Sequence, residues 1–379
     1  MKKIIFVTGT RADYGKIKSL IVELKKRKKF KIFIFVTGIH NLKVFGKTRD
    51  QLVFDKLGSL HFFNNQSHAI KNNSMDLILA KTINGLNKFI NKIKPDLLVV
   101  HGDRVESLAG AIVGSLNNIR VAHVEGGEVS GTIDEALRHS ISKLAHVHFV
   151  TNNKAKKRLE QLGERSKNIY VIGSPDVDII LGKNLPSIND TKKRYNIIFK
   201  KYAILILHPV TTAVEKIKNE LKVLYKVLVE TKFNYIVLYP NNDSGSELIF
   251  DFIKKKLSKL KNFRILPSMR FENYLTLLKN SYFIIGNSSS GIMEAPYYGV
   301  ATLNLGTRQF NRANLKSIYN LEYKKHQIKK KVEYFSRKKI TLNKIFYFGN
   351  GNSHLKFCRI LDQKNFWLID KQKVFVEKK

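Results

Sequence analysis

Short apolar runs alternate with segments of helical periodicity through most of the chain. In the first half, the apolar runs predict strands at Lys3–Val7, Lys31–Val36, Pro95–Val100, Arg120–His123, Val147–Thr151 and Ile169–Ile172. The helical spacing predicts helices at Met75–Ile93, Val105–Leu116, Asp134–Ala145 and Asn152–Leu162. Residues 41–73 are predicted as helix and irregular loop. Strand and helix in alternation are typical of a parallel, doubly wound sheet.

The second half repeats this alternation. Strands are predicted at Ala203–Leu207, Tyr235–Tyr239, Phe263–Leu266, Phe283–Ile285 and Val300–Leu303. A polar stretch from Gly173 through Asp190 separates the halves and is typical of a hinge. We therefore expect an α/β protein with two Rossmann-like doubly wound domains, residues 1–173 and 174–379, that face each other across a cleft. Residues 350–379 are expected to pack back on the N-terminal domain.

Length and composition agree with two globular domains. The chain has 379 residues, too many for one typical core, and 43% of them are hydrophobic. No apolar run approaches the length of a membrane span, and the first residues read as a strand instead of a signal peptide, so we expect no membrane contact. The single cysteine, Cys358, excludes an intrachain disulfide and a cysteine-based zinc cluster. These features predict a cytoplasmic protein.

The formal net charge of +38 invites an assignment as a nucleic-acid-binding protein. The lysines, however, lie in scattered runs such as 254–256 and 329–331, without interleaved aromatic residues that would stack on bases. We interpret the charge as a lysine-rich surface that helps to attract an anionic substrate, and we expect no nucleic-acid partner.

Polar residues follow two consecutive predicted strands of the first half. Asp103 and Arg104 follow the strand that ends at Val100, and the segment EGGE, which contains Glu125 and Glu128, follows the next strand. In a parallel sheet the carboxyl ends of neighbouring strands lie at one edge, where ligands bind. Asp103 and Glu125 are therefore expected within reach of one ligand.

Asp134 and Arg138 come next, at a spacing that places them on one face of a helix. Taken singly, such residues have ordinary structural interpretations. An Asp after a strand is often a turn or a helix cap, and an Asp–Arg pair four residues apart is often a solvated surface pair. The concentration of carboxylates, histidines and arginines along this stretch is not explained by turns alone and favours a catalytic site.

Other strand ends carry candidates for anion binding. Arg11 lies in a glycine-containing loop that opens a helix, and His40 follows the second strand. In the second half, the loop GNSSSG at 286–291 offers N–H and O–H donors to an anion, and Arg308 is suited to reach the same phosphates. Glu294 is suited to accept hydrogen bonds from a ribose diol. The chain has no Walker A motif and no G-x-G-x-x-G after its first strand, which disfavours a nucleotide triphosphatase or a dinucleotide enzyme.

Several segments, in order, resemble the hydrolysing UDP-N-acetylglucosamine 2-epimerases of sialic-acid biosynthesis. They are GTRADYGKIKSL, VTGIHNL, HGDRVESLAGA, HVEGGEVSGTIDEALRHSISKLAH, GSPDVD, HPVTT, YPNNDSG, GNSSSGIMEAP and NLGTRQ. The resemblance runs from about residue 4 to residue 312, and the fourth segment is the most specific. It implies two Rossmann-like domains in a GT-B-like arrangement. It also implies conversion of UDP-N-acetylglucosamine and water to N-acetylmannosamine and UDP through a 2-acetamidoglucal intermediate.

The resemblance also implies roles for individual residues. The catalytic set is Asp103, Glu125, Asp134 and His208, the last of which supports the departing diphosphate. Which carboxylate is the base and which is the acid stays open. The implied substrate contacts are Arg11, His40, Arg104, Glu128, Arg138, Asn241, Ser288, Ser289, Glu294 and Arg308. The resemblance implies a nucleotide sugar as the small-molecule partner, no metal, no cofactor, and a homodimer.

Two alternatives remain open. The same chemistry on a nucleotide-linked 2,4-diacetamido-2,4,6-trideoxyhexose would serve legionaminic acid synthesis, and the residues around C4 and C6 of the sugar are not assigned. A GT-B glycosyltransferase shares the fold and the nucleotide site but does not need the three carboxylates. The non-hydrolysing epimerases carry motifs that differ from HVEGGEVSGTID. Consumption of a UDP-sugar without an acceptor separates the epimerases from a transferase.

Overall fold

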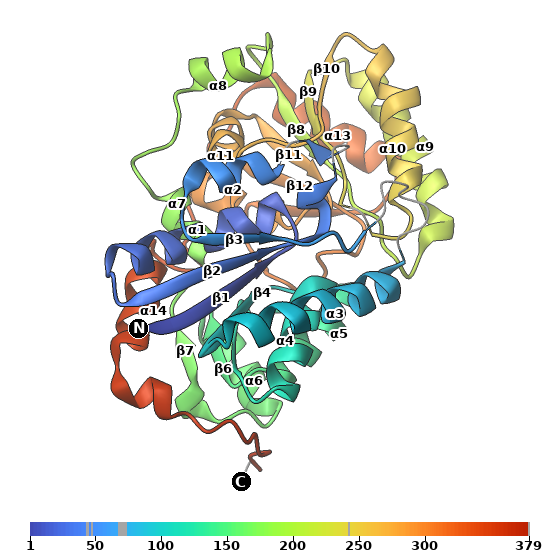
Figure 1. Ribbon diagram of the computed structural model, residues 1–379. Helices are drawn as coiled ribbons and strands as arrows, with labels where there is room; N and C mark the ends of the chain where they lie inside the picture. Colours follow the sequence, from blue (N-terminus) through green and yellow to red (C-terminus); the bar gives the residue numbers. More distant parts are fainter. Residues whose placement is uncertain (43–44, 47, 67–73, 242, 378–379) are drawn as a thin grey trace. The chain divides into compact units, whose positions relative to one another are not determined.

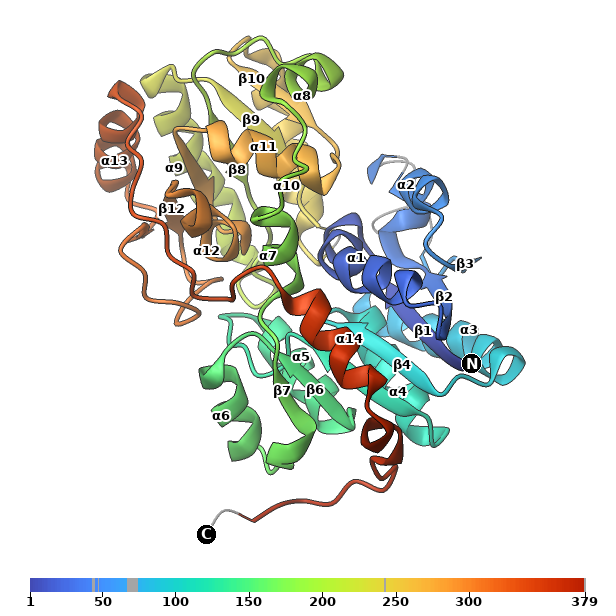
Figure 2. The same cartoon turned by 90° about the vertical axis from the view of Figure 1, so that its left-hand side faces the viewer.

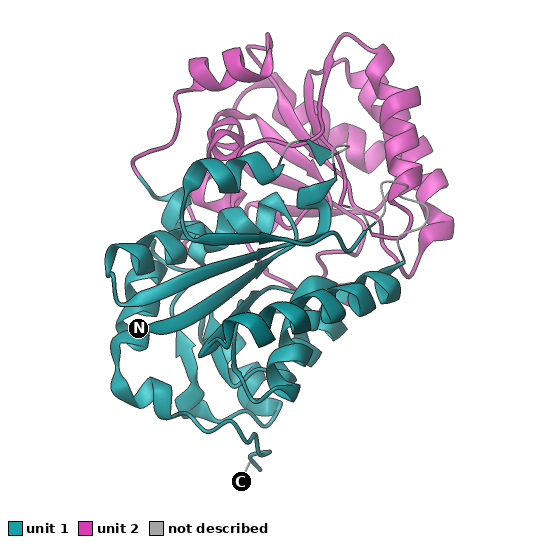
Figure 3. Ribbon diagram, viewed as in Figure 1, with its two compact units in different colours: residues 1–128, 134–182, 347–379 teal, residues 129–133, 183–346 magenta. Residues whose placement is uncertain are grey.

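The computed structural model describes residues 1–379 except 43–44, 47, 67–73, 242 and 378–379. The chain divides into two compact units (Figure 3). Unit 1 comprises Met1–Glu128, Asp134–Gly182 and Tyr347–Lys379, and unit 2 comprises Val129–Ile133 and Lys183–Phe346. The division after Gly182, compared with the expected division after residue 173, leaves the helix α7 (Pro175–Ile180) in unit 1.

Unit 1 is built on a seven-stranded sheet in which every pair is parallel, in the order β3-β2-β1-β4-β5-β6-β7 (Figure 1). The strands are β1 Lys2–Thr8, β2 Phe30–Val36, β3 Ser59–Phe62, β4 Leu97–His101, β5 Arg120–Val124, β6 Val147–Val150 and β7 Ile169–Val171. Helix and irregular loop were predicted where β3 lies, and this prediction was wrong. β3 pairs on one side only and has no buried residue, so it lacks the apolar run that marks the central strands.

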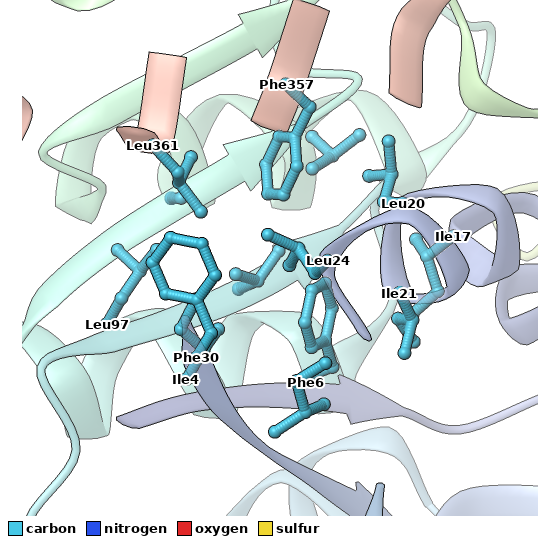
Figure 4. Close-up of a cluster of buried hydrophobic side chains, with 14 of the residues drawn as sticks. Ile4, Phe6, Ile17, Leu20, Ile21, Leu24, Phe30, Leu97, Phe357 and Leu361 are labelled. Atoms are coloured by element: carbon cyan, nitrogen blue, oxygen red, sulfur yellow. The ribbon is translucent and has the colours of Figure 1, made fainter. Parts of the chain in front are cut away.

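Helices cover both faces of this sheet. They are α1 Arg11–Lys26, α2 Thr48–Asp55, α3 Met75–Ile93, α4 Val105–Leu116, α5 Ile133–Leu144, α6 Asn153–Gln161, α7 Pro175–Ile180 and α14 Ser353–Asp362, with 3₁₀ turns η1 Gly38–Asn41, η4 Ser166–Asn168 and η8 Lys364–Leu368. Along β1, Ile4 and Phe6 enter a core with α1 and α14 (Figure 4), whereas Ile5 and Val7 enter a core with α3, α4 and α5. This division follows from the alternation of side chains along a strand.

Unit 2 is built on a six-stranded parallel sheet in the order β10-β9-β8-β11-β12-β13. The strands are β8 Ala203–Ile206, β9 Tyr235–Leu238, β10 Phe263–Leu266, β11 Phe283–Gly286, β12 Ala301–Leu305 and β13 Ile318–Leu321. The helices are α8 Ile188–Tyr195, α9 Ile217–Thr231, α10 Ser246–Lys255, α11 Phe271–Asn280, α12 Ser290–Met293 and α13 Lys325–Arg337, with 3₁₀ turns η5 Val214–Lys216, η6 Leu257–Lys259 and η7 Ala295–Tyr298. Helices α9, α10 and α13 share one core with the sheet.

The C-terminal segment belongs to unit 1, where α14 lies next to α1 (Figure 2). Asp178 caps its first turn: Oδ1 accepts from the Ser353 N–H at 2.8 Å, and Oδ2 accepts from the His354 N–H at 2.9 Å. The segment GSPDVD therefore begins α7 at Pro175, and its last residue, Asp178, caps α14. No helix within the described ranges is both long and apolar enough to cross a membrane.

Candidate active site

The carboxyl ends of β4 and β5 carry the central residues of the site. The two strands are parallel neighbours, so the loops that bear Asp103 and Glu125 leave the same edge of the sheet, as the sequence predicted. Between them, Gly102 adopts a φ of +72°, and among the described residues other than its own chain neighbours no heavy atom lies within 4 Å of the position that a Cβ would take there. The backbone at this edge thus leaves room for a ligand.

Glu125 is a buried carboxylate in an unusual backbone conformation. Its φ is +65°, which residues other than glycine seldom adopt, and the residue is 3% exposed. Oε1 accepts a hydrogen bond from the Ser174 hydroxyl, and Oε2 lies 3.3 Å from His101 Nε2 and 3.8 Å from Lys16 Nζ. Although burial opposes it, the Lys16 ammonium group and the neighbouring His101 ring hold the pKa of Glu125 well below its usual range. The side chain is therefore ionised at neutral pH.

Arg138 pairs with Asp103. The guanidinium is 1% exposed, its Nη2 contacts Asp103 Oδ2, and its Nη1 donates to the Glu128 carbonyl at 3.3 Å. Asp134, in the first turn of α5, is only half-buried. The pairing restrains the Asp103 carboxylate, whose side chain keeps 26% of its surface exposed.

His123 and Ser174 support these loops, and neither was predicted as a site residue from the sequence. His123 is fully buried, with Nε2 2.7 Å from the Gly102 carbonyl and Nδ1 2.9 Å from the Ser142 hydroxyl. Burial lowers the pKa of His123 to about 3, so the ring is neutral. Ser174, which binds Glu125, lies just before α7. In the sequence, His123 is a polar residue inside an apolar strand and Ser174 is a polar residue after one. This was the only sequence feature that could have indicated their roles.

Glu128 is 1% exposed, and its Oε1 accepts a hydrogen bond from the Thr151 hydroxyl at the end of β6.

The backbone N–H groups of Gly9 and Thr10, in the loop after β1, have partners within the chain. Helix α1 already begins at Arg11, and Thr10 and Asp13 form a capping box. Asp13 accepts from the N–H of Gly9 at 2.9 Å and from the N–H of Thr10 at 3.2 Å, so these donors are satisfied within the chain. Burial raises the pKa of Asp13. The guanidinium of Arg11 remains as the candidate phosphate ligand of this loop.

His40 and Arg104 are also held by neighbours. His40 is 1% exposed, with Nε2 3.0 Å from Thr8 Oγ1 and Nδ1 3.1 Å from Thr48 Oγ1, and burial lowers the pKa of His40 to about 3. Both ring nitrogens therefore have hydrogen-bond partners within the chain, and His40 holds the side chain of Thr8 in place. Arg104 Nε donates to the buried carboxylate of Glu106 at 3.2 Å.

In unit 2, a second group of candidates lies around the ends of β8, β9 and β11. The Asn241 N–H donates to His208 Nδ1 at 3.1 Å, and the Asn241 side chain donates to Asp243. The side chain of Asn287 bonds both backbone groups of His208, and Arg308 Nη1 donates to the Asn287 carbonyl at 3.4 Å. Asn287, which the sequence did not predict as a site residue, thus contacts both His208 and Arg308, and Asn241 contacts His208.

The serine-rich loop at 286–291 leads into a short helix. Helix α12 has four residues, and Glu294 is its C-cap. Ser288 Oγ accepts from the Ser290 N–H at 3.3 Å, whereas the Ser289 hydroxyl makes no capping hydrogen bond. Glu294 is 3% exposed. Gly286, with a φ of +130°, lets β11 pass so close to β8 that a Cβ would lie 1.9 Å from the Ile206 carbonyl oxygen.

Comparison with known proteins decides the family. The family model described as UDP-N-acetylglucosamine 2-epimerase matches residues 22–362. The chain belongs to the UDP-N-acetylglucosamine 2-epimerase family. The matched range contains the candidate residues of both units except Arg11.

Individual members of the UDP-N-acetylglucosamine 2-epimerase family are similar over most or all of the chain. A UDP-N-acetylglucosamine 2-epimerase from Neisseria meningitidis serogroup B is 39% identical over 100% of this chain and 99% of its own length. A hydrolysing UDP-N,N'-diacetylbacillosamine 2-epimerase from Legionella pneumophila is 33% identical over 85% of each. The crystal structure of the Methanocaldococcus jannaschii epimerase with UDP-GlcNAc and UDP is 24% identical, with a TM-score of 0.79 over 96% of this chain and 99% of that one, and it supports the fold.

Proposed function

We propose that this epimerase is hydrolysing and converts UDP-N-acetylglucosamine and water to N-acetylmannosamine and UDP, for sialic acid synthesis. The observation that carries the proposal is the pairing of two acidic strand ends, Asp103 held by Arg138 and Glu125 held by Ser174 and His101. Relatives whose names specify hydrolysis, from Legionella pneumophila and Campylobacter jejuni, are 33% and 34% identical. A relative from Escherichia coli that is named a polysialic acid biosynthesis protein is 33% identical.

The reaction needs two steps. In the first, a carboxylate removes the proton from C2 of the sugar while the C1–O bond to the diphosphate breaks, and the electron pair of the C–H bond forms the C1–C2 double bond of 2-acetamidoglucal. In the second, a second acidic side chain donates a proton to C2 on the opposite face while water adds its oxygen to C1. The proton that the water loses passes to this second side chain, and the base of the first step releases the former C2 proton to solvent, which restores the starting state. Asp103, Glu125 and Asp134 are our candidates for these transfers.

Unit 2 supplies the nucleotide contacts in this proposal. His208 and Arg308 stabilise the charge that develops on the leaving diphosphate, as do Ser288 and Ser289 through their hydroxyl groups. Glu294 accepts hydrogen bonds from the ribose, and Asn241 contacts the nucleotide. Unit 1 adds Arg11 and Arg104 for the phosphates, while Glu128 orients the sugar.

The second candidate substrate is a nucleotide-linked 2,4-diacetamido-2,4,6-trideoxyhexose. It is favoured by the similarity to the diacetylbacillosamine epimerases. Its C2 carries the same acetamido group, so the three carboxylates would act on it in the same way.

An acceptor-free incubation with UDP-N-acetylglucosamine in deuterated water, followed by proton NMR, tests the proposal. Release of UDP together with N-acetylmannosamine that carries deuterium at C2 is the expected result. Formation of UDP-N-acetylmannosamine without UDP release would instead establish a non-hydrolysing enzyme. If neither occurs, the diacetamido substrate is tested under the same conditions, and failure with both substrates overturns the proposal.

A further inference from the structure

Asn287 connects three elements of unit 2. It follows β11, and its side chain binds His208 beyond the end of β8: Oδ1 accepts from the His208 N–H at 2.7 Å, and Nδ2 donates to the His208 carbonyl at 2.8 Å. Its own carbonyl accepts from Arg308 Nη1 at 3.4 Å and from Gln309 Nε2 at 3.1 Å, both beyond β12. The residue is 4% exposed. One buried side chain and its carbonyl thus contact the two proposed ligands of the leaving diphosphate.

The amide group of asparagine fits this place for a chemical reason. The backbone of His208 presents one donor and one acceptor, and the amide side chain supplies the matching acceptor and donor from the two ends of one planar group. Aspartate at this position would place a carboxylate oxygen against the His208 carbonyl. A hydrocarbon side chain would leave two buried backbone groups without partners.

The ring of His208 is fixed as well as its backbone. Nδ1 accepts a hydrogen bond from the Asn241 N–H at 3.1 Å. A ring nitrogen that accepts carries a lone pair, so the proton of the neutral imidazole lies on Nε2. The ring therefore presents an N–H donor, from a backbone that Asn287 holds on both sides.

We propose that Asn287 is a positioning residue that holds His208 as an Nε2–H donor to the leaving diphosphate and holds the guanidinium of Arg308 through its carbonyl. The inference rests on the proposed function. In this arrangement His208 stabilises the developing charge by a hydrogen bond and keeps its proton. The protons that move at C2 and at the water therefore pass through the carboxylates of unit 1.

The variant Asn287→Asp tests this role with almost no change in volume. We expect kcat/KM for the nucleotide sugar to fall about 100-fold, because a small misplacement of a positioned group has an effect of this size, and we expect the affinity for UDP measured by calorimetry to fall with it. The matched control is Asn304→Asp. Asn304 is 2% exposed in β12, and its Nδ2 donates to Asn320 Oδ1 at 2.8 Å. Loss of this hydrogen bond disturbs the same sheet but should leave kcat/KM near the wild-type value.

A double variant separates positioning from a purely structural role. If Asn287 acts largely through His208, the fold-loss that Asn287→Asp causes in kcat/KM will be much smaller in the His208→Gln background than in the wild type. Equal fold-losses in both backgrounds would overturn the proposal.

A measurement on the wild-type protein does not depend on turnover or on a variant that folds. In NMR spectra of protein with ¹⁵N-labelled histidine, the signals that disappear in His208→Gln should show the Nε2-protonated tautomer at about pH 7.5. An Nδ1-protonated ring would overturn the proposal. If the wild type fails to convert the sugar nucleotide, this spectrum and the UDP titration still decide the role of Asn287, so the two failures are distinguishable.

Discussion

At the scale of single residues, the proposed chemistry depends on three acidic side chains, two that follow strands and one in the first turn of α5. Each of Asp103→Asn, Glu125→Gln and Asp134→Asn removes a charge while it keeps the shape of the side chain. We expect turnover to fall at least about 100-fold in each, because a missing proton acceptor or donor has an effect of this order. Steady-state kinetics and circular dichroism are the measurements. Near-wild-type turnover in any one variant would remove that residue from the catalytic set.

The positive φ of Glu125 predicts a difference in stability between two variants at this position. The variants Glu125→Ala and Glu125→Gly both delete the carboxylate, so they lose the same contacts to Ser174, His101 and Lys16. They differ in the backbone, because glycine adopts a φ of +65° without the steric cost that alanine pays. We expect the glycine variant to be more stable than the alanine variant by about 1 kcal/mol in urea unfolding. Equal stabilities would show that the loop relaxes to a negative φ once the carboxylate is gone.

At the scale of elements, the C-terminal segment after α14 is part of the fold of unit 1. Arg120 Nε donates to the Ile369 carbonyl at 2.7 Å, and Lys373 Nζ lies 2.6 Å from Glu164 Oε2. The Phe375 ring occupies the space where Gly163 lacks a Cβ. We expect truncation after Asp370 to lower the free energy of unfolding by about 2 kcal/mol, because it leaves the buried Glu164 with fewer partners. Truncation after Val376 is the control and should have little effect.

The same cluster makes the stability of unit 1 sensitive to acid. Although burial opposes it, hydrogen bonds from His148 and Lys373 lower the pKa of Glu164 to about 2. A carboxyl whose pKa is lower in the folded state stabilises the fold above its ordinary pKa, and this contribution is lost as the pH falls toward the folded value. The difference in unfolding free energy between wild type and Glu164→Gln should therefore be constant above about pH 5 and shrink toward about pH 2. A difference that grows on acidification would contradict the assignment.

The elements that could be predicted from the sequence are those with long apolar or amphipathic patterns. The helix at 75–93 was predicted with the observed bounds, as were the helix at 105–116 and the strand at 263–266. The helices α7 and α8 were missed because the polar stretch and Pro175 indicated a hinge, whereas proline also favours the first turn of a helix. At the site, the sequence predicted that Asp103 and Glu125 lie at the same edge of the sheet, because they follow consecutive parallel strands. Supports such as Ser174, His123 and Asn287 could not, because their partners lie far away in the sequence.

At the scale of the whole molecule, the charge is the feature with a consequence for function. The chain carries 68 Lys and Arg residues against 30 Asp and Glu, and a field of this sign attracts a nucleotide sugar with its anionic diphosphate. We expect kcat/KM to fall about tenfold between about 20 and about 300 mM NaCl, with kcat nearly unchanged, because salt screens the encounter but not the bound site.

A charge-reduced variant separates this long-range effect from direct binding. Lys254 and Lys256 are exposed near the end of α10 and lie outside the proposed site. In Lys254→Gln/Lys256→Gln, kcat/KM should fall slightly at low salt and match the wild type at high salt, where the Debye length is shorter. A wild-type kcat/KM that does not change with salt would show that the lysine-rich surface contributes nothing to substrate capture. The arginines and serines of the site would then account for the binding of the diphosphate by themselves.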